Sequence, residues 1–271
     1  MAEHRDRQRL RHTFGAVVEL YDRARPEYPA VVFDDLAELA RLGPGSRVLE
    51  IGPGTGKATA ELARRGYAVS GVELSPELAE LARRNVPDAE IVTADFETWE
   101  PQEAGFDAVA VFNAFHWIAA DIRYAKPARL LRAGGALAVV GAPHVLPAGG
   151  DPFFAEVQQD YDAVVPHPDN RPPPPPDGIE GWAEEWRASG FFERIEERRH
   201  LVEIPYTADE YIAVLGTFSD NLALPAAQRD ELFRRIHARI LERPGATVTK
   251  HHLLVLTIGR SRQVPVPGTR T

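Results

Sequence analysis

Helix-period segments alternate with short β-rich runs from residue 8 to about residue 141, and this alternation constrains the fold more than any other feature. Helical periodicity fills residues 57–65 and the segment that begins at Ser75-Pro76, a favourable N-cap and N1 pair. Strands that alternate with helices form a parallel sheet covered by helices. The pattern therefore predicts an α/β fold of the Rossmann-like type. The predicted strands are residues 47–51, 67–72, 89–93, 106–112 and 135–141.

The regular alternation of helices and strands ends after residue 142. Five consecutive prolines, Pro172 to Pro176, exclude regular helix and central strand at that segment. We expect an ordered surface loop or stiff spacer there. The later periodicities predict a helical cap inserted late in the chain, whose apolar stripe mostly packs as core. The predicted elements are helices at 179–189, 207–218 and 226–242 and strands at 193–204 and 247–258.

Composition removes several classes of protein. The chain has 271 residues, a formal charge of −9 and no cysteine. The missing cysteine excludes disulfides, iron-sulfur clusters, thiolate zinc sites and cysteine nucleophiles, and we assign no metal ligands. No segment approaches the roughly 20 apolar residues that span a bilayer, and residues 1–12 are polar. We therefore expect a cytoplasmic protein with no membrane contact and, since the sequence is acidic without basic runs, no nucleic-acid partner.

A glycine cluster at residues 52–56 follows the first predicted strand and opens a helix, where glycine lets the backbone approach a ligand. Three nucleotide-binding patterns compete for it. A P-loop fails twice, because Ile51 stands at its first glycine and Ala58 follows its lysine. The dinucleotide fingerprint is damaged but not eliminated, because Lys57 replaces its third glycine. The third pattern, acid-x-Gly-x-Gly-x-Gly, is complete.

That third pattern resembles motif I of the class I S-adenosylmethionine-dependent methyltransferases. Glu73 ends the second predicted strand, where a carboxylate can accept hydrogen bonds from both hydroxyls of a ribose. On its own, Glu73 is explained as well by a solvated carboxylate in front of a helix. The resemblance implies S-adenosylmethionine as cofactor and S-adenosylhomocysteine as product. It implies that the cofactor is held by Glu50, Gly52, Pro53, Gly54, Thr55, Gly56 and Glu73.

Three later motifs follow in the order that the family shows. The resemblance implies that Asp95 accepts a hydrogen bond from the adenine amine and that Phe96 or Leu74 packs on the ring. It also implies that the backbone of Asn113 and Ala114 faces the methionine portion of the cofactor. The segment 130–135 resembles the approach to the family's fifth strand. The resemblance covers about residues 46–141 and says almost nothing about the acceptor.

His116 is the predicted catalytic residue. Methyl transfer from a sulfonium is an in-line displacement, so positioning and water exclusion matter more than catalytic groups. A carboxylate acceptor needs no base, whereas a hydroxyl or ammonium must lose a proton. His116 follows the fourth strand, at the sheet edge where doubly wound folds bind ligands, and it titrates in the useful range. We predict that His116 acts as base or orients the acceptor and that both His116 and Trp117 bind substrate. The alternative is that both only shape the pocket or cap the next helix.

The segment Tyr-x-x-x-Arg-Pro-x-Tyr-Pro at residues 21–29 resembles the N-terminal signature of small-molecule methyltransferases akin to the trans-aconitate methyltransferase group. The His116-Trp117 pair and residues 216–219 resemble the same group. The resemblance implies that the N-terminal segment covers the cofactor, that Tyr21, Arg25 and Tyr28 contact its methionine end, and that Phe218 binds substrate. The alternative is a proline-stiffened entry to the first helix with Arg25 in a surface ion pair.

The sequence therefore predicts a class I methyltransferase with a seven-stranded mixed sheet whose last strand runs antiparallel, acting as a monomer or homodimer. We expect O-methylation, on a carboxylate or hydroxyl, of a small metabolite or natural-product intermediate. N- or C-methylation, a nicotinamide-dependent oxidoreductase and a non-catalytic methyltransferase-like binding module stay open. The expected segments are a covering helical segment at 1–45, the cofactor-binding core at 46–141, a proline-rich insertion at 142–190, the last strands with the cap at 191–260, and a disordered tail at 261–271.

Overall fold

The computed structural model describes residues 18–167 and 170–262. The predicted tail therefore lies almost wholly outside the described residues. Within them the chain forms two compact units. Unit 1 takes the N-terminal residues up to Pro26 together with Ala142–Glu180 and His200–Leu254. Unit 2 takes Glu27–Gly141, Gly181–Arg199 and the residues from Val255 onward.

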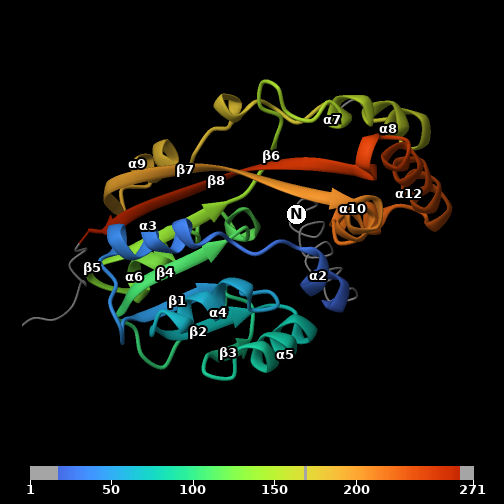
Figure 1. Cartoon of the computed structure of the whole chain (residues 1–271). Helices are drawn as coiled ribbons and strands as arrows, with labels where there is room; N and C mark the ends of the chain where they lie inside the picture. Colours follow the sequence, from blue (N-terminus) through green and yellow to red (C-terminus); the bar gives the residue numbers. More distant parts are fainter. Residues whose placement is uncertain (1–17, 168–169, 263–271) are drawn as a thin grey trace, which may run out of the picture. The chain divides into compact units, whose positions relative to one another are not determined.

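Unit 2 is built on a mixed sheet in the order β3-β2-β1-β4-β5-β8 (Figure 1). The first five strands are parallel, and β8 is antiparallel to β5. Val48, Leu49 and Ile51 of β1 are all buried, which is typical of a parallel strand covered on both faces. The predicted Rossmann-like α/β fold and its antiparallel last strand are thus confirmed. The strand bounds are β1 (Arg47–Ile51), β2 (Ala68–Glu73), β3 (Glu90–Thr93), β4 (Phe106–Phe112), β5 (Leu131–Gly141) and β8 (Thr247–Ser261).

The sheet has one strand more than the seven predicted. Two further strands pair with β8: β6 (His144–Val145) and β7 (Phe192–Thr207). A two-residue strand carries no readable alternation, so β6 is invisible in the sequence. β7 and β8 are each long enough to run through both units.

The helices of unit 2 begin and end for local reasons. The Ser75 hydroxyl accepts a hydrogen bond from the Leu78 N–H at 3.3 Å, as the predicted N-cap should. α6 ends at Leu130, because Leu131 already pairs with Phe106 as the first residue of β5. The core includes Trp186, which is fully buried. The helix bounds are α3 (Ala30–Ala40), α4 (Lys57–Arg64), α5 (Pro76–Asn85), η2 (Phe115–Trp117), α6 (Ala125–Leu130) and α9 (Ala183–Ser189).

Unit 1 is mainly helical and has its own core. α10 packs against both α12 and α2, and α12 packs against α8. α10 begins with a capping box in which Thr207 and Glu210 exchange side chain-to-backbone hydrogen bonds. Leu232, Ile236 and Ile240 are fully buried, so the apolar stripe of α12 is core as expected. The helix bounds are α2 (Val18–Ala24), α7 (Phe153–Glu156), α8 (Gln158–Val164), η3 (Pro176–Gly178), α10 (Ala208–Leu215), α11 (Ser219–Ala223), α12 (Ala226–Leu241) and η4 (Pro244–Ala246).

The first four residues of the proline run are neither helix nor strand, as predicted, and Pro176 begins η3. The N–H of Leu146 donates to the carbonyl of Pro174 at 2.9 Å, which ties the run to the rest of unit 1. Among the described helices, none combines the length and apolarity needed to cross a bilayer.

Candidate functional site

The glycine loop between β1 and α4 is the centre of the candidate site. Gly52 and Gly54 have φ angles of 69° and 59°, in the left-handed region that favours glycine. A Cβ at Gly52 would lie 2.9 Å from the Cβ of Ala114, closer than real side chains approach. A Cβ at Gly54 would meet nothing within 4 Å. The loop therefore turns sharply over Ala114 and leaves open space beside Gly54.

Glu73 lies against this space at the end of β2. Its side chain is 7% exposed, and its two carboxylate oxygens each accept a backbone hydrogen bond of 2.9 Å, from Gly54 and from Ser75. Burial raises the pKa of Glu73, while these N–H donors act in the opposite direction. A carboxylate has about four acceptor positions, so Glu73 keeps acceptor capacity beyond its backbone donors. The loop thus fixes a carboxylate that can still accept from a diol.

Glu50 at the end of β1 is the second acid of the site. It is 1% exposed, and the hydroxyl of Thr59 on α4 donates to it at 2.6 Å. Burial raises the pKa of Glu50 to about 7, and the charge of Glu73 adds to the rise. No basic side chain in the described part of the chain forms an ion pair with either acid. The site therefore holds two buried acids whose charge the protein itself does not neutralise.

Thr55 contributes an unsatisfied group to the same loop. Its residue is 2% exposed, and its buried hydroxyl has no hydrogen-bond partner among the described residues. Its carbonyl accepts from the side-chain amide of Asn85 at 2.9 Å, which ties the loop to α5. The buried Pro53 lies against Gly71 of β2, and Gly56 is the N-cap of α4. An orphaned buried hydroxyl is costly, and it is the kind of group that a ligand can satisfy.

The residues after β3 are held mainly by local structure. Asp95 is half-buried and accepts from the N–H of Glu97 at 2.9 Å, so its carboxylate closes a turn. The Phe96 ring is buried in the core of unit 2, with the ammonium of Lys126 5.0 Å from its centroid. Leu74, the other candidate for packing on adenine, is half-buried beside Glu73. The placement of Phe96 favours a core role, and the adenine contacts stay predictions.

Asn113 and Ala114 form the opposite wall of the glycine loop. Asn113 has a φ of 53°, unusual for a residue other than glycine, and its N–H donates to the carbonyl of Val140 at 2.8 Å. Its side-chain amide donates to the hydroxyl of Tyr28 at 3.0 Å. The structure therefore brings Tyr28, predicted from the N-terminal signature, to the end of β4. Backbone outside the common regions is concentrated at functional sites.

His116 and Trp117 lie in η2, directly after this wall. Their rings are 4.8 Å apart, centroid to centroid. The His116 side chain is exposed, yet surrounding protein atoms lower its pKa by desolvation. A lowered pKa keeps more of the imidazole in the neutral form, which can accept a proton at pH 7. The preceding residue, Phe115, is buried and anchors the turn that presents His116.

Tyr21, Arg25 and Phe218 belong to unit 1, whereas Tyr28 belongs to unit 2. The guanidinium carbon of Arg25 lies 4.2 Å from the centroid of Phe218 and 5.1 Å from that of Tyr21. Its Nε donates to the hydroxyl of Thr217 at 2.8 Å, and no carboxylate of the described residues pairs with it. The structure thus unites Arg25 with Phe218 in unit 1. The predicted cofactor contacts of Tyr21 and Arg25 stay predictions.

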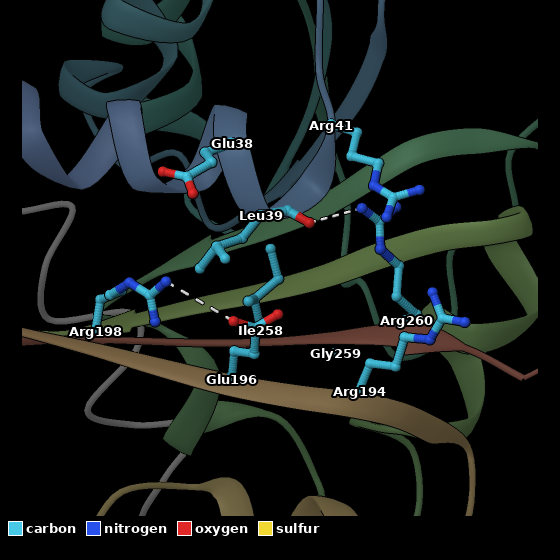
Figure 2. A pocket seen from close by; sticks show the side chains of 9 residues that line it. All are labelled: Glu38, Leu39, Arg41, Arg194, Glu196, Arg198, Ile258, Gly259 and Arg260. Carbon is cyan, nitrogen blue, oxygen red and sulfur yellow. Dashed lines mark hydrogen bonds and ion pairs between the residues drawn. The ribbon is translucent and has the colours of Figure 1, made fainter.

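Sequence reasoning missed Thr59, the residue that orients Glu50. The available signal was its position on the apolar face of α4, where a hydroxyl needs a buried partner. It also missed an arginine pocket of about 210 Å³ in unit 2 (Figure 2). No basic run marks this pocket, because its arginines come from distant segments. The arginines are Arg41, Arg194, Arg198 and Arg260.

The arginine pocket is separate from the candidate site. Arg260 pairs with Ala136, which in turn pairs with Ala108 near the start of β4, whereas the glycine loop follows the end of β1. Figure 2 shows Arg260 bonded to Leu39, and its guanidinium donates to that carbonyl at 2.6 Å and to Ala40 at 3.3 Å. These are the last carbonyls of α3, so Arg260 acts as a C-terminal cap. The pocket is lined by none of the candidate cofactor residues.

Comparison with known proteins points to one class of domain. A family model described as a methyltransferase domain matches residues 48–135. An uncharacterised methyltransferase of Mycobacterium tuberculosis is 36% identical over 128 residues, which are 47% of this chain and 51% of that protein. The chain thus spans about half the length of these mycobacterial relatives. An uncharacterised methyltransferase of Schizosaccharomyces pombe is 22% identical over 257 residues, covering 94% of this chain and 98% of that protein.

Solved structures share the fold. One described as a type II methyltransferase from Anaeromyxobacter dehalogenans has a TM-score of 0.59 at 22% identity, covering 87% of this chain and 97% of that chain. Phosphoethanolamine N-methyltransferase 2 of Haemonchus contortus, crystallised with phosphomonomethylethanolamine and S-adenosylhomocysteine, has a TM-score of 0.54 at 16% identity. That match covers 92% of this chain and 58% of that chain. The described fold is that of the class I methyltransferases.

Proposed function

We propose that this chain, whose residues 48–135 match the model of a methyltransferase domain, transfers a methyl group from S-adenosylmethionine to a small-molecule acceptor. The observation that carries the proposal is the pairing of Gly54 with Glu73. The same backbone turn that leaves open space also fixes a carboxylate at its edge with acceptor capacity to spare. A ribose diol matches that unused capacity.

The charges of the site favour a cationic cofactor. Glu50 and Glu73 are buried without a basic partner among the described residues, and S-adenosylmethionine carries a sulfonium and an ammonium. A buried acid gains most from an opposite charge close by. When bound, the sulfonium supplies an electrophilic methyl group and a neutral thioether leaving group. Thr59 holds Glu50 in place through its hydroxyl.

The chain's own residues then position the acceptor and move its proton. His116 is exposed and desolvation lowers its pKa, which favours the neutral imidazole that can take the proton of a hydroxyl acceptor. Trp117, beside His116, contributes aromatic surface to acceptor binding. These features support O-methylation of a carboxylate or hydroxyl on a metabolite or natural-product intermediate. Action as a cytoplasmic monomer or homodimer, without nucleic acid, belongs to the same proposal.

Calorimetric titration of the full chain with S-adenosylhomocysteine tests the cofactor assignment. Wild type should bind, and Glu73→Gln should bind about tenfold or more weakly, because an amide cannot accept from two backbone N–H groups and a diol together. The exposed Asp88→Asn is the matched control and should bind as wild type does. A heat of binding on titration with NAD, and none on titration with S-adenosylhomocysteine, would favour an oxidoreductase instead. Turnover of a metabolite pool with labelled methyl donor then identifies the acceptor.

A further inference from the structure

Lys250 on β8 is a buried lysine without an acidic partner. Its residue is 3% exposed, and no carboxylate of the described residues forms a hydrogen bond or ion pair with it. Its ammonium lies 4.9 Å from the centroid of Phe218. Burial and the charge of Arg25 lower the pKa of Lys250 to about 7. Burying an uncompensated ammonium is costly, so a methionine of similar shape would serve the fold better.

A second cation approaches the same ring. The guanidinium carbon of Arg25 lies 4.2 Å from the centroid of Phe218, on a side chain that is only half-buried. Both cations therefore meet at one aromatic residue of unit 1, although like charges repel. Cation–π attraction offsets part of this repulsion. It does not supply hydrogen-bond acceptors for the N–H groups that remain.

The neighbouring polar groups are neutral and partly unsatisfied. Burial and the charge of Lys250 lower the pKa of His144 to about 2 and that of His252 to about 4. A ring nitrogen of His252 lies 3.0 Å from the carbonyl oxygen of Ala142. The Nε2 of His144 and the hydroxyl of Tyr206 are buried without a partner among the described residues. We call Arg25, His144, Tyr206, Phe218, Lys250 and His252 the cationic cluster.

The cationic cluster lacks one component. It holds two cations, orphaned polar groups and an aromatic floor, and all six residues belong to unit 1. Acids occur nearby, but they are used elsewhere: Glu203 approaches His251 at 3.3 Å, and Glu210 closes the capping box of α10. The ammonium and the guanidinium beside this ring are charged donors that no carboxylate of the described residues pairs with, and an oxyanion is the group that would pair with them. An oxyanion beside the ring would compensate the charges of both cations.

We propose that the cationic cluster of unit 1 binds the oxyanion group of a small molecule, either a carboxylate or a phosphate ester, with Lys250 and Arg25 as its charged donors. This oxyanion site stands on the contacts of the cluster alone and does not depend on the proposed methyltransferase function. The sequence signal is a single lysine within the largely buried strand from Val248 to Ile258. Phe218, predicted to bind substrate, would then form the apolar floor of this site.

Thermal unfolding and calorimetry of the full chain at pH 7 test the proposal with three probes. These are succinate for carboxylates, inorganic phosphate for phosphate esters, and sodium chloride at equal ionic strength. Succinate or phosphate should raise Tm of the wild type above the chloride value, and the better probe identifies the class of oxyanion. Lys250→Met should weaken binding of that probe about 30-fold or more, as truncating one partner of a buried charge pair does.

Lys126→Met is the matched control. Lys126 is also buried, but its ammonium donates to the carbonyls of Trp99 and Glu97 and lies 3.6 Å from a carboxylate oxygen of Glu100. Lys126→Met should therefore lower Tm without probe and keep the response to it. Lys250→Met should raise Tm without probe, because it removes an unpaired buried charge. Arg25→Gln, at a half-buried position, is a second variant that should weaken probe binding.

Two results would overturn the oxyanion site: a wild type that responds to neither probe beyond chloride, or a Lys250→Met variant that responds as the wild type does. Titration with S-adenosylhomocysteine runs in parallel and separates the two proposals. Loss of the cofactor response with a retained anion response refutes the methyltransferase proposal and supports the oxyanion site. The converse pattern supports the methyltransferase and refutes the oxyanion site.

Discussion

Replacing Glu50 by glutamine should make this protein more stable at alkaline pH and leave its stability in acid almost unchanged. The side chain is 1% exposed and accepts from the hydroxyl of Thr59 at 2.6 Å. Glutamine has the same shape, and its carbonyl oxygen can accept that hydrogen bond. The substitution therefore removes the titration of residue 50 while keeping its packing.

The direction and the magnitude of this stability change follow from the raised pKa of Glu50. Burial raises the pKa of Glu50 from 4.5 to about 7, so the folded protein holds this proton more tightly than the unfolded chain does. Below pH 4.5 the carboxyl is protonated in both states and carries no penalty. Between pH 4.5 and 7 only the unfolded chain releases the proton, and the folded state loses stability. At about 1.4 kcal/mol for each pH unit, the loss reaches about 3 kcal/mol above pH 7.

Urea unfolding of wild type and Glu50→Gln at pH 4.5, 6 and 8 measures this difference. Other groups titrate alike in both proteins, so their contributions cancel in the comparison. The free energy of unfolding of Glu50→Gln minus that of wild type should rise by about 3 kcal/mol from pH 4.5 to pH 8. Glu90→Gln, at an exposed position, should show no such rise. A difference for Glu50→Gln that stays constant with pH would refute the buried-acid argument.

Three other predictions concern the loop, the base and the C-terminal cap. Gly54→Ala and Gly45→Ala both place alanine at positive φ with no atom within 4 Å, so each should lose about 1–2 kcal/mol in urea unfolding. Only Gly54→Ala should also weaken S-adenosylhomocysteine binding. Equal affinities of the two variants would contradict a cofactor site beside Gly54. His116→Ala should slow turnover of a hydroxyl acceptor about 100-fold or more with little change in cofactor affinity, and unchanged turnover would remove His116 as base. Arg260→Met should lower the free energy of unfolding by about 1–3 kcal/mol, because α3 loses its C-terminal cap. A urea midpoint equal to that of the wild type would show that the cap is dispensable.

The sequence alone located the strands that frame the site. The predicted runs 47–51 and 106–112 coincide with β1 and β4, because a buried parallel strand is a short apolar run bounded by turn residues. The strand predicted at 135–141 begins earlier, at Leu131, since pairing with Phe106 across a register shift extends β5. Such pairing depends on a partner strand and has no local signal.

The candidate site, too, was predictable from the sequence only in part. The glycine spacing and the acid after β2 predicted a ligand loop, and the structure brings Gly54 and Glu73 within hydrogen-bond distance. The spacing did not predict that Thr59 holds Glu50 or that Asn113 binds Tyr28. Those contacts join segments whose distance is set by helix packing and by the path of the chain.

The sequence by itself determined the α/β alternation, the sharp loop and the acid at its edge, because periodicity and glycine content act over a few neighbouring residues. Only the tertiary structure decided which groups lose water and which charges face each other. Glu50 titrates near neutrality because the sheet buries it, and the charge of Arg25 acts on Lys250 because the fold places both residues in unit 1. Desolvation and Coulomb interactions depend on distances in space, and these the fold alone sets.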